Sequence, residues 1–289
     1  MEKIYVQIPA YRDSELAPTL IAIFATAARP ERIRVGVFWQ HGEDELLPQT
    51  VLDNPNIEII AVHYSRSNGC NWARRELQKR WNNEEYTMFI DSHHRFINDW
   101  DDRLIEMYKN LQSKGIEKPL LTTYLPPYNP LNDPQERDLN PLKIYPSSRE
   151  RGLLIYLVAH KIPCWSWLRQ PVPAQFASLH FIFTRGAFNV EIPFDDTIYF
   201  FGDEVLTGLR AFTHGYDLYH PHYVMGWHLY NRDNTRITHW NDHPDYDQRH
   251  ERSHTKMRDI FLGVETHDLG TERTIQDYER WIGNKLLKC

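Results

Sequence analysis

The stretch Tyr86–Phe96, with the sequence YTMFIDSHHRF, decides which fold and which chemistry we expect of this chain. Its first five residues are mostly apolar and have the character of a strand that is buried on both faces. Acidic and imidazole groups follow directly, at the point where such a strand would leave its sheet. Because ligands collect at that edge of an open α/β sheet, the stretch predicts a buried strand that ends in a binding site.

Asp91 and His93 are the first candidate metal ligands. Side chains two positions apart in an extended segment point the same way, so one oxygen and one nitrogen can reach a single cation. The alternative is that Asp91 or Ser92 caps a following helix, with His93 and His94 partly exposed. Two ligands are half of a metal site, so other parts of the chain must supply the rest.

Length, charge and cysteine content exclude several classes of protein. A chain of 289 residues with 13% aromatic residues has enough volume for a substantial core. A net charge of -6 argues against a non-specific nucleic-acid binder, which needs a basic surface. The cysteines Cys70, Cys164 and Cys289 are far apart, which argues against a disulfide scaffold. Without a membrane-length apolar run or a signal-peptide core, we expect a cytoplasmic protein with no transmembrane segment.

Alternating strand and helix patterns predict an α/β fold with a mainly parallel central sheet, helices on its faces, one core and no second domain. Pro9 is expected to end the first strand, and residues 125–148, which hold six prolines, to form a surface excursion. The polar region with Asp242, His243, Asp245 and Asp247 is expected to be a loop. The expected strands are 4–8, 33–39, 57–63, 86–90, 120–124 and 152–160, and the expected helices are 16–24, 72–81, 100–111, 203–212 and 271–287.

A loop after the first strand suits a nucleotide, with Arg12 near a phosphate and Tyr11 against a base. The alternative is a plain turn with a solvated arginine, because the loop lacks the glycines that admit a phosphate closely. Arg74, near a helix start, is poorly placed for the helix dipole but well placed for a phosphate gathered there. Including polar residues at the other strand ends, the candidate nucleotide-binding residues are Pro9, Ala10, Tyr11, Arg12, Gln40, Arg74, Asp91 and Ser92.

The region Asp195–Arg232 carries the remaining candidates. Asp203 and Glu204 open a helix after an aromatic turn where a substrate hydroxyl could bind, although adjacent carboxylates at a helix start also simply favour its dipole. Four histidines follow, and sequence spacing does not choose which of them completes the metal site. They are His214, His220, His222 and His228.

Three stretches together, IPAYRDSELAPTL, FIDSHHRF and FFGDEVLTGLRAFTHGYDLYHPHYVMGWH, resemble a known family. The chain looks like the GlcNAc-transferases related to the cytoplasmic enzyme that glycosylates hydroxyproline on a ubiquitin-ligase adaptor. These are retaining, metal-dependent glycosyltransferases of GT-A fold, distantly similar to the mucin-type polypeptide N-acetylgalactosaminyltransferases. The resemblance covers residues 3–232, and it implies a single GT-A domain with a C-terminal helical extension over residues 233–289.

This resemblance implies a role for each candidate. Asp91 and His93 match the D-x-H element, and His228 matches the histidine that closes a Mn²⁺ (or Mg²⁺) site bridging the phosphates of UDP. The segment Pro9–Arg12 matches the part that holds the uridine, and Arg74 matches an arginine near the donor. Asp203 and Glu204 stand where the mucin-type enzymes carry a sugar-contacting G-G-E sequence, but this chain reads F-G-D-E. That departure leaves the donor sugar open.

The resulting hypothesis is a metal-dependent retaining glycosyltransferase that moves a sugar from a UDP donor to a hydroxyl acceptor, and GlcNAc is the sugar that the resemblance favours. The acceptor could be a protein, a glycan or a small molecule, and the Trp165–Trp167 segment and the proline-rich excursion are candidates for contacting it. A metal-dependent nucleotide-sugar or phosphoester hydrolase is the alternative, because the same residues could activate water. A non-catalytic protein that binds sugars or nucleotides is a third hypothesis.

Overall fold

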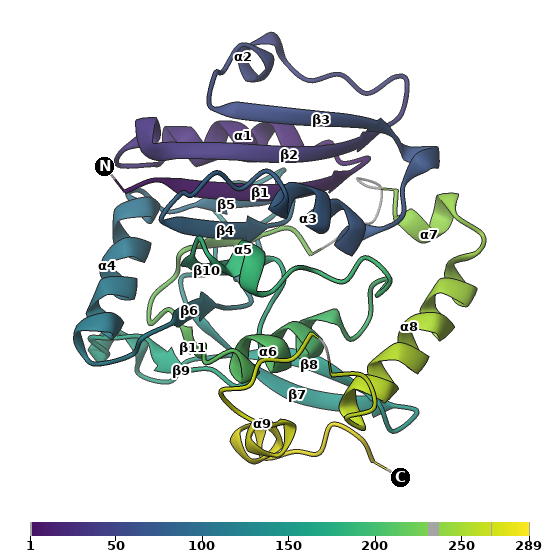
Figure 1. Cartoon of the computed structure of the whole chain (residues 1–289). Coiled ribbons are helices and arrows are strands. Elements are labelled where there is room, and N and C mark those ends of the chain that lie inside the picture. The colour runs from purple at the N-terminus through teal and green to yellow at the C-terminus, as the bar shows by residue number, and fades with distance from the viewer. Residues whose placement is uncertain (1, 231–236, 267, 289) are drawn as a thin grey trace.

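The computed structural model describes residues 2–230, 237–266 and 268–288, and Figure 1 shows their arrangement. Arg232, the last residue of the region Asp195–Arg232, and the cysteine Cys289 lie outside these ranges. The helices are α1 Leu16–Ala25, α2 Gln49–Leu52, α3 Cys70–Gln78, α4 Trp100–Ser113, α5 Phe188–Glu191, α6 Asp203–Thr213, α7 His239–Asp242, α8 Tyr246–Phe261 and α9 Ile275–Ile282, with 3-10 turns at Pro30–Arg32, Tyr64–Arg66 and Trp165–Trp167. The strands are β1 Ile4–Tyr11, β2 Ile33–His41, β3 Ile57–His63, β4 Tyr86–Ile90, β5 His94–Phe96, β6 Pro119–Thr122, β7 Leu142–Glu150, β8 Leu154–Lys161, β9 Val172–Pro173, β10 Phe181–Arg185, β11 Asp217–His220 and β12 Gly226–His228.

A large sheet organises the molecule. Among the described residues it has eight strands in the order β3-β2-β1-β4-β10-β6-β11-β9. β3, β2, β1 and β4 run parallel, β10 is antiparallel to β4 and β6, and β11 is parallel to β6. The prediction of a mainly parallel sheet flanked by helices is therefore confirmed. The carboxyl ends of β1, β2 and β4 meet at one edge, as the sequence pattern required.

Alternate side chains of the central strands point to opposite faces of the sheet, and helices cover both faces. On one face, Ile4, Val6, Ile8 and Ala10 of β1 pack in a cluster with α1 and α4. On the other, the Tyr5 hydroxyl donates to a carbonyl oxygen of α3, and Phe89 of β4 packs with residues of α5 and α6. All five residues of β4 are buried, as expected for a strand covered on both faces.

A second apolar cluster lies at the lower end of the molecule in Figure 1, where α6, α8 and α9 meet the β7–β8 hairpin. This cluster is separate from the one that packs with α1 and α4. The proline-rich excursion is shorter than expected, because β7 begins at Leu142 and pairs with β8. Pro146 fits in that strand because the register shifts between Pro146 and Arg149, and prolines are accommodated at such irregularities.

Two further expectations about element boundaries were wrong. Pro9 does not end the first strand, since β1 continues to Tyr11. Beyond Gln7, β1 pairs only with β2, so a residue without an N–H is tolerated there. β2 likewise extends past its expected end at residue 39, through Gln40 to His41.

The C-terminal polar region is helical, not a loop. Asp242 ends α7, and Asp247 lies in the first turn of α8. The buried residues of α8 include Ser253 and His254 next to Met257, Ile260 and Phe261, so its apolar periodicity is too weak to detect from the sequence. No helix among the described residues is long and apolar enough to cross a membrane.

Candidate active site

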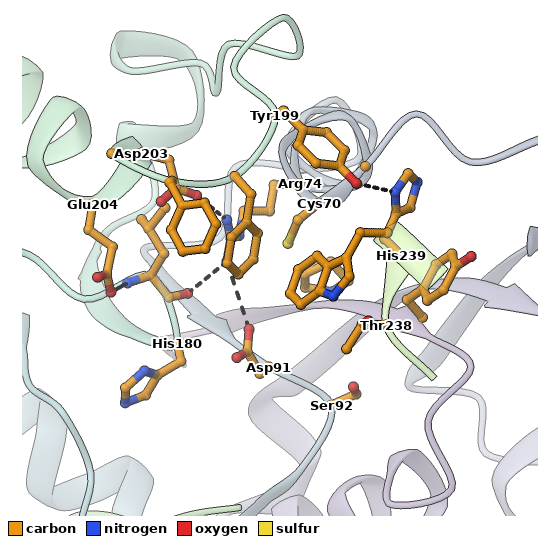
Figure 2. A pocket seen from close by; sticks show the side chains of 18 of the residues that line it. Cys70, Arg74, Asp91, Ser92, His180, Tyr199, Asp203, Glu204, Thr238 and His239 are labelled. Atoms are coloured by element: carbon orange, nitrogen blue, oxygen red, sulfur yellow. Dashed lines mark hydrogen bonds and ion pairs between the residues drawn. The ribbon is translucent and has the colours of Figure 1, made fainter. Parts of the chain in front are cut away.

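A cavity of about 360 Å³ opens at the carboxyl edge of β1, β2 and β4, and Figure 2 shows part of its lining. The start of α3, the turn before α6, strand β8 and helix α7 complete its walls. Most of the predicted site residues line it, namely Pro9, Tyr11, Gln40, Arg74, Asp91, Ser92, His93, Asp203, Glu204 and His228. Ala10 is fully buried in the core, and Arg12 does not line the cavity.

Asp91, His93 and His228 come together at this edge. One ligand atom from each lies within 4.8 Å of the other two. His228 Nε2 is 3.3 Å and His93 Nε2 is 3.7 Å from Asp91 Oδ2. The meeting depends on the short ladder between β5 and β12, in which His228 is the register partner of His94.

These three side chains suit a divalent metal ion. A set of imidazole nitrogens and one carboxylate oxygen is typical of transition-metal sites. Burial raises the pKa of Asp91, but the hydrogen bond with His228 and the charges of His93 and Arg74 outweigh burial and hold that pKa well below its usual range. Burial, with the nearby His180 and His93, holds the pKa of His228 well below its usual range. An ionised carboxylate beside a neutral imidazole is the state that binds metal.

The other candidate histidines lie elsewhere. His214 contacts the Arg210 carbonyl at the end of α6, and His220 is buried against the Thr122 carbonyl. His222 is half-buried beside Tyr223. None of these three belongs to the metal-competent group found among the described residues.

We therefore expect His228→Ala to weaken Mn²⁺ binding by about tenfold or more, because it removes one of three converging donors. His222→Ala is the matched control and should leave the Mn²⁺ dissociation constant within about twofold. Isothermal titration calorimetry on both variants measures this. Retained affinity in His228→Ala together with lost affinity in His222→Ala would show that the third ligand is misassigned.

Arg74 joins the metal group to the start of α6, as Figure 2 shows. Its Nη1 lies 3.1 Å from Asp203 Oδ2 and its Nη2 lies 3.7 Å from Asp91 Oδ1. Asn71 and the Leu179 carbonyl accept its remaining contacts. The side chain is only 5% exposed, and both terminal nitrogens of the guanidinium contact protein groups. Arg74 therefore acts on this edge by holding two carboxylates in place.

Glu204 lies beside Asp203 with different partners. The Tyr124 hydroxyl donates to its Oε2 at 2.6 Å, and the Leu179 N–H donates to its Oε1 at 3.1 Å. Burial, followed by the negative charge of Asp203, raises the pKa of Glu204 to about 7. Burial also raises the pKa of Asp203 to about 6, although Arg74 offsets part of the effect. Two acids in one wall thus titrate near neutral pH.

The pH dependence of the free energy of unfolding should reveal the raised pKa of Glu204. The folded protein raises the pKa of Glu204 above its ordinary value of 4.5. The stability that this carboxyl contributes is therefore fully present below pH 4.5 and is lost as the pH rises through about 7. Glu204→Gln removes the titration, so its stability relative to wild type should increase by about 2 kcal/mol between pH 5 and pH 8. Urea denaturation at both pH values measures the difference. A pH-independent difference would contradict the raised pKa.

Arg12 is placed differently from its predicted role. Its guanidinium pairs with Asp242 at 3.0 Å and with Glu45 at 3.3 Å. The Tyr11 hydroxyl also donates to Asp242, at 2.7 Å. These contacts attach α7 to the end of β1, while His239 of α7 contacts the Tyr199 hydroxyl at 2.6 Å (Figure 2). Arg12 therefore holds a wall of the cavity, and Tyr11 keeps its predicted place in the lining.

Several cavity residues escaped the sequence argument. Tyr124 and His180 line the cavity, and the His180 ring stacks on that of His228 with centroids 4.3 Å apart. Asp13 contacts His93 Nδ1 at 2.7 Å. Asp13 directly follows the segment assigned to the nucleotide, so its position was the only available signal. Trp165 and Trp167, by contrast, do not line the cavity.

Comparison with known proteins gives one family and one fold. The family described as Glycosyltransferase (GlcNAc) matches residues 3–52 and 45–284. GalNAc-T7, solved with UDP, GalNAc and Mn²⁺, is 14% identical over 98% of this chain with a TM-score of 0.59, and this chain spans 55% of its length. S. aureus TarS 1-349 in complex with UDP-GlcNAc is 13% identical, with a TM-score of 0.57. The match covers 97% of this chain and 70% of the TarS chain. Among curated protein sequences, none matches.

Proposed function

Because the chain belongs to the Glycosyltransferase (GlcNAc) family and has a GT-A fold, we propose that it transfers a sugar from a UDP donor to a hydroxyl acceptor with retention. GlcNAc is the donor sugar that the family description favours. The observation that carries the proposal is the convergence of Asp91, His93 and His228 at one end of the cavity. The family membership favours transfer over the hydrolase alternative.

Each wall of the cavity has a part in this proposal. Asp91, His93 and His228 would hold Mn²⁺, which when bound would neutralise the diphosphate that leaves the sugar. Tyr11 and Gln40, at the ends of β1 and β2, would contact the nucleoside. Ser92 lies beside the metal ligands on the same edge.

The sugar would lie toward the start of α6. Asp203 and Glu204 line this side of the cavity and offer carboxylate oxygens to sugar hydroxyls. Neither needs to act as a nucleophile, because a donor phosphate oxygen can accept the acceptor proton during attack on the same face. Arg74 would orient Asp203 and Asp91 for these contacts.

The acceptor hydroxyl would enter past the aromatic side chains at the cavity mouth. Phe200 and Trp240 have ring centroids 5.6 Å apart, and Phe201, which lies 6.2 Å from Tyr156, is 42% exposed. All four line the cavity, so they replace Trp165 and Trp167 as our leading acceptor contacts. The resemblance to a cytoplasmic hydroxyproline-modifying group makes a protein hydroxyl in the cytoplasm the first acceptor to test.

Release of UDP tests the proposal without a known acceptor. Purified protein is incubated with UDP-GlcNAc, UDP-GalNAc and UDP-glucose, with Mn²⁺ and then with a chelator. We expect slow, chelator-sensitive release from one donor, and stabilisation by UDP with Mn²⁺ in thermal unfolding. Silence across the donors, without such stabilisation, would refute a glycosyltransferase of this kind. Binding of UDP without turnover of any sugar, even with acceptors present, would instead support the non-catalytic hypothesis.

A further inference from the structure

The loop that follows β1 places a carboxylate, that of Asp13, against one of the candidate metal ligands. Asp13 does not belong to the metal-competent group itself. Asp13 is 7% exposed, and its Oδ2 lies 2.7 Å from His93 Nδ1. The same oxygen accepts from the Ser92 hydroxyl at 2.6 Å, while Oδ1 accepts from the Glu15 N–H at 3.0 Å. The carboxylate is thus fixed from two sides before it meets the histidine.

This contact determines which nitrogen of His93 carries the proton. An ionised carboxylate only accepts hydrogen bonds, so Nδ1 must be the protonated nitrogen that donates to Asp13. Nε2 then carries the lone pair. Nε2 is also the nitrogen on the side of Asp91, at 3.7 Å from Oδ2. The geometry therefore presents a metal-binding lone pair toward the ligands Asp91 and His228.

A second contact of Nδ1 agrees with this state. The Ser92 hydroxyl lies 3.5 Å from Nδ1, at the limit of a hydrogen bond. Because that hydroxyl donates its single proton to Asp13 Oδ2, it can only accept from Nδ1, which again places the proton on Nδ1. A carboxylate beside the distal nitrogen also makes the ligating nitrogen more basic. Loss of the Asp13 charge would therefore remove the acceptor that holds the proton on Nδ1 and the ring in place.

We propose that Asp13 is a positioning residue that holds His93 in the tautomer and orientation needed to bind the metal ion. The proposal rests on the metal site of the proposed function. Asp13 also joins two parts of the cavity, since Tyr11 lies two residues earlier on the same strand end and His93 follows β4. The Asp13 carboxylate thus orients the metal ligand His93, and it does so from the loop that we propose holds the nucleoside.

The test compares Asp13→Asn with wild type in two measurements on the full chain. Titration with Mn²⁺ alone, by calorimetry, should show affinity weakened about 10- to 100-fold in the variant. Asp101→Asn is the matched control, because Asp101 is an equally buried carboxylate paired with Arg32, away from the cavity lining. It should leave Mn²⁺ affinity unchanged. Equal weakening in both variants would indicate a merely structural effect and overturn the proposal.

Histidine tautomers are read without any metal by long-range ¹H–¹⁵N spectra, with the His93 signals assigned from His93→Gln. Wild-type protein should show His93 protonated at Nδ1, and Asp13→Asn should shift it toward the other tautomer. Protonation at Nε2 in the wild type would overturn the proposal even if the variant did not fold. Failure of the wild type to bind Mn²⁺ would instead count against the proposed function, and the tautomer measurement would still decide the role of Asp13.

Discussion

Asp91→Asn is expected to abolish metal-dependent UDP-sugar turnover while the fold survives. The substitution keeps the shape of the side chain but removes the only carboxylate of the metal-competent group found among the described residues. It also leaves His93 and His228 facing a neutral amide. Loss of charge stabilisation at the departing diphosphate should lower kcat/KM on the order of 10³-fold. Steady-state UDP release with Mn²⁺ measures this, and circular dichroism checks the fold.

Asp217→Asn is the matched control for this experiment. Asp217 is a carboxylate on β11 that pairs with Arg273 at 2.8 Å, outside the cavity lining. Its loss should leave Mn²⁺ affinity and turnover unchanged. An Asp91→Asn enzyme with wild-type, chelator-sensitive activity would show that the metal site has been misassigned.

Arg74→Met should produce the largest loss of stability at the site, about 3–5 kcal/mol at pH 8. The methionine fills much of the arginine volume, so the main effect is electrostatic. Asp203 and Asp91 would lose the buried cation that lies 3.1 Å and 3.7 Å from them. Burial already raises the pKa of Asp203 to about 6, and Arg74 opposes that rise. Without the guanidinium, Asp203 should remain protonated to a higher pH.

The pH dependence distinguishes this mechanism from simple loss of packing. At pH 5 Asp203 would be neutral in the variant, so the destabilisation should be smaller there than at pH 8. Urea denaturation at both pH values measures it. Arg34→Met is a comparison on the same sheet, because Arg34 pairs with Glu84 and Glu58 away from the cavity. It should lower stability without lowering turnover, and an equal loss at both pH values in Arg74→Met would contradict the electrostatic explanation.

Local patterns were sufficient where a segment is buried on both faces or alternates strongly. β3 and β4 occur where the sequence predicts them, because apolar side chains must leave water wherever the chain runs. Boundaries were less accurate, since β1 passes through Pro9 only because its neighbour on one side stops early. α8 was missed because its buried face contains the polar residues Ser253 and His254 beside the apolar ones, which weakens the apolar periodicity. For the end of β1 and for α8, the contacts that decide the structure come from distant segments of the chain.

From the sequence alone we could predict that a buried strand is followed by Asp91 and His93 at the carboxyl edge of an α/β sheet, because strand burial and side-chain alternation are local properties. Spacing along the chain did not choose among the four later histidines, and the family resemblance pointed to His228. The tertiary structure places His228 beside Asp91 and His93 because β12 pairs with β5. The tertiary structure also shows that Arg12 pairs with Asp242 and that Asp13 contacts His93. Contacts between residues far apart in the chain depend on how the elements pack, and no spacing along the sequence encodes that distance.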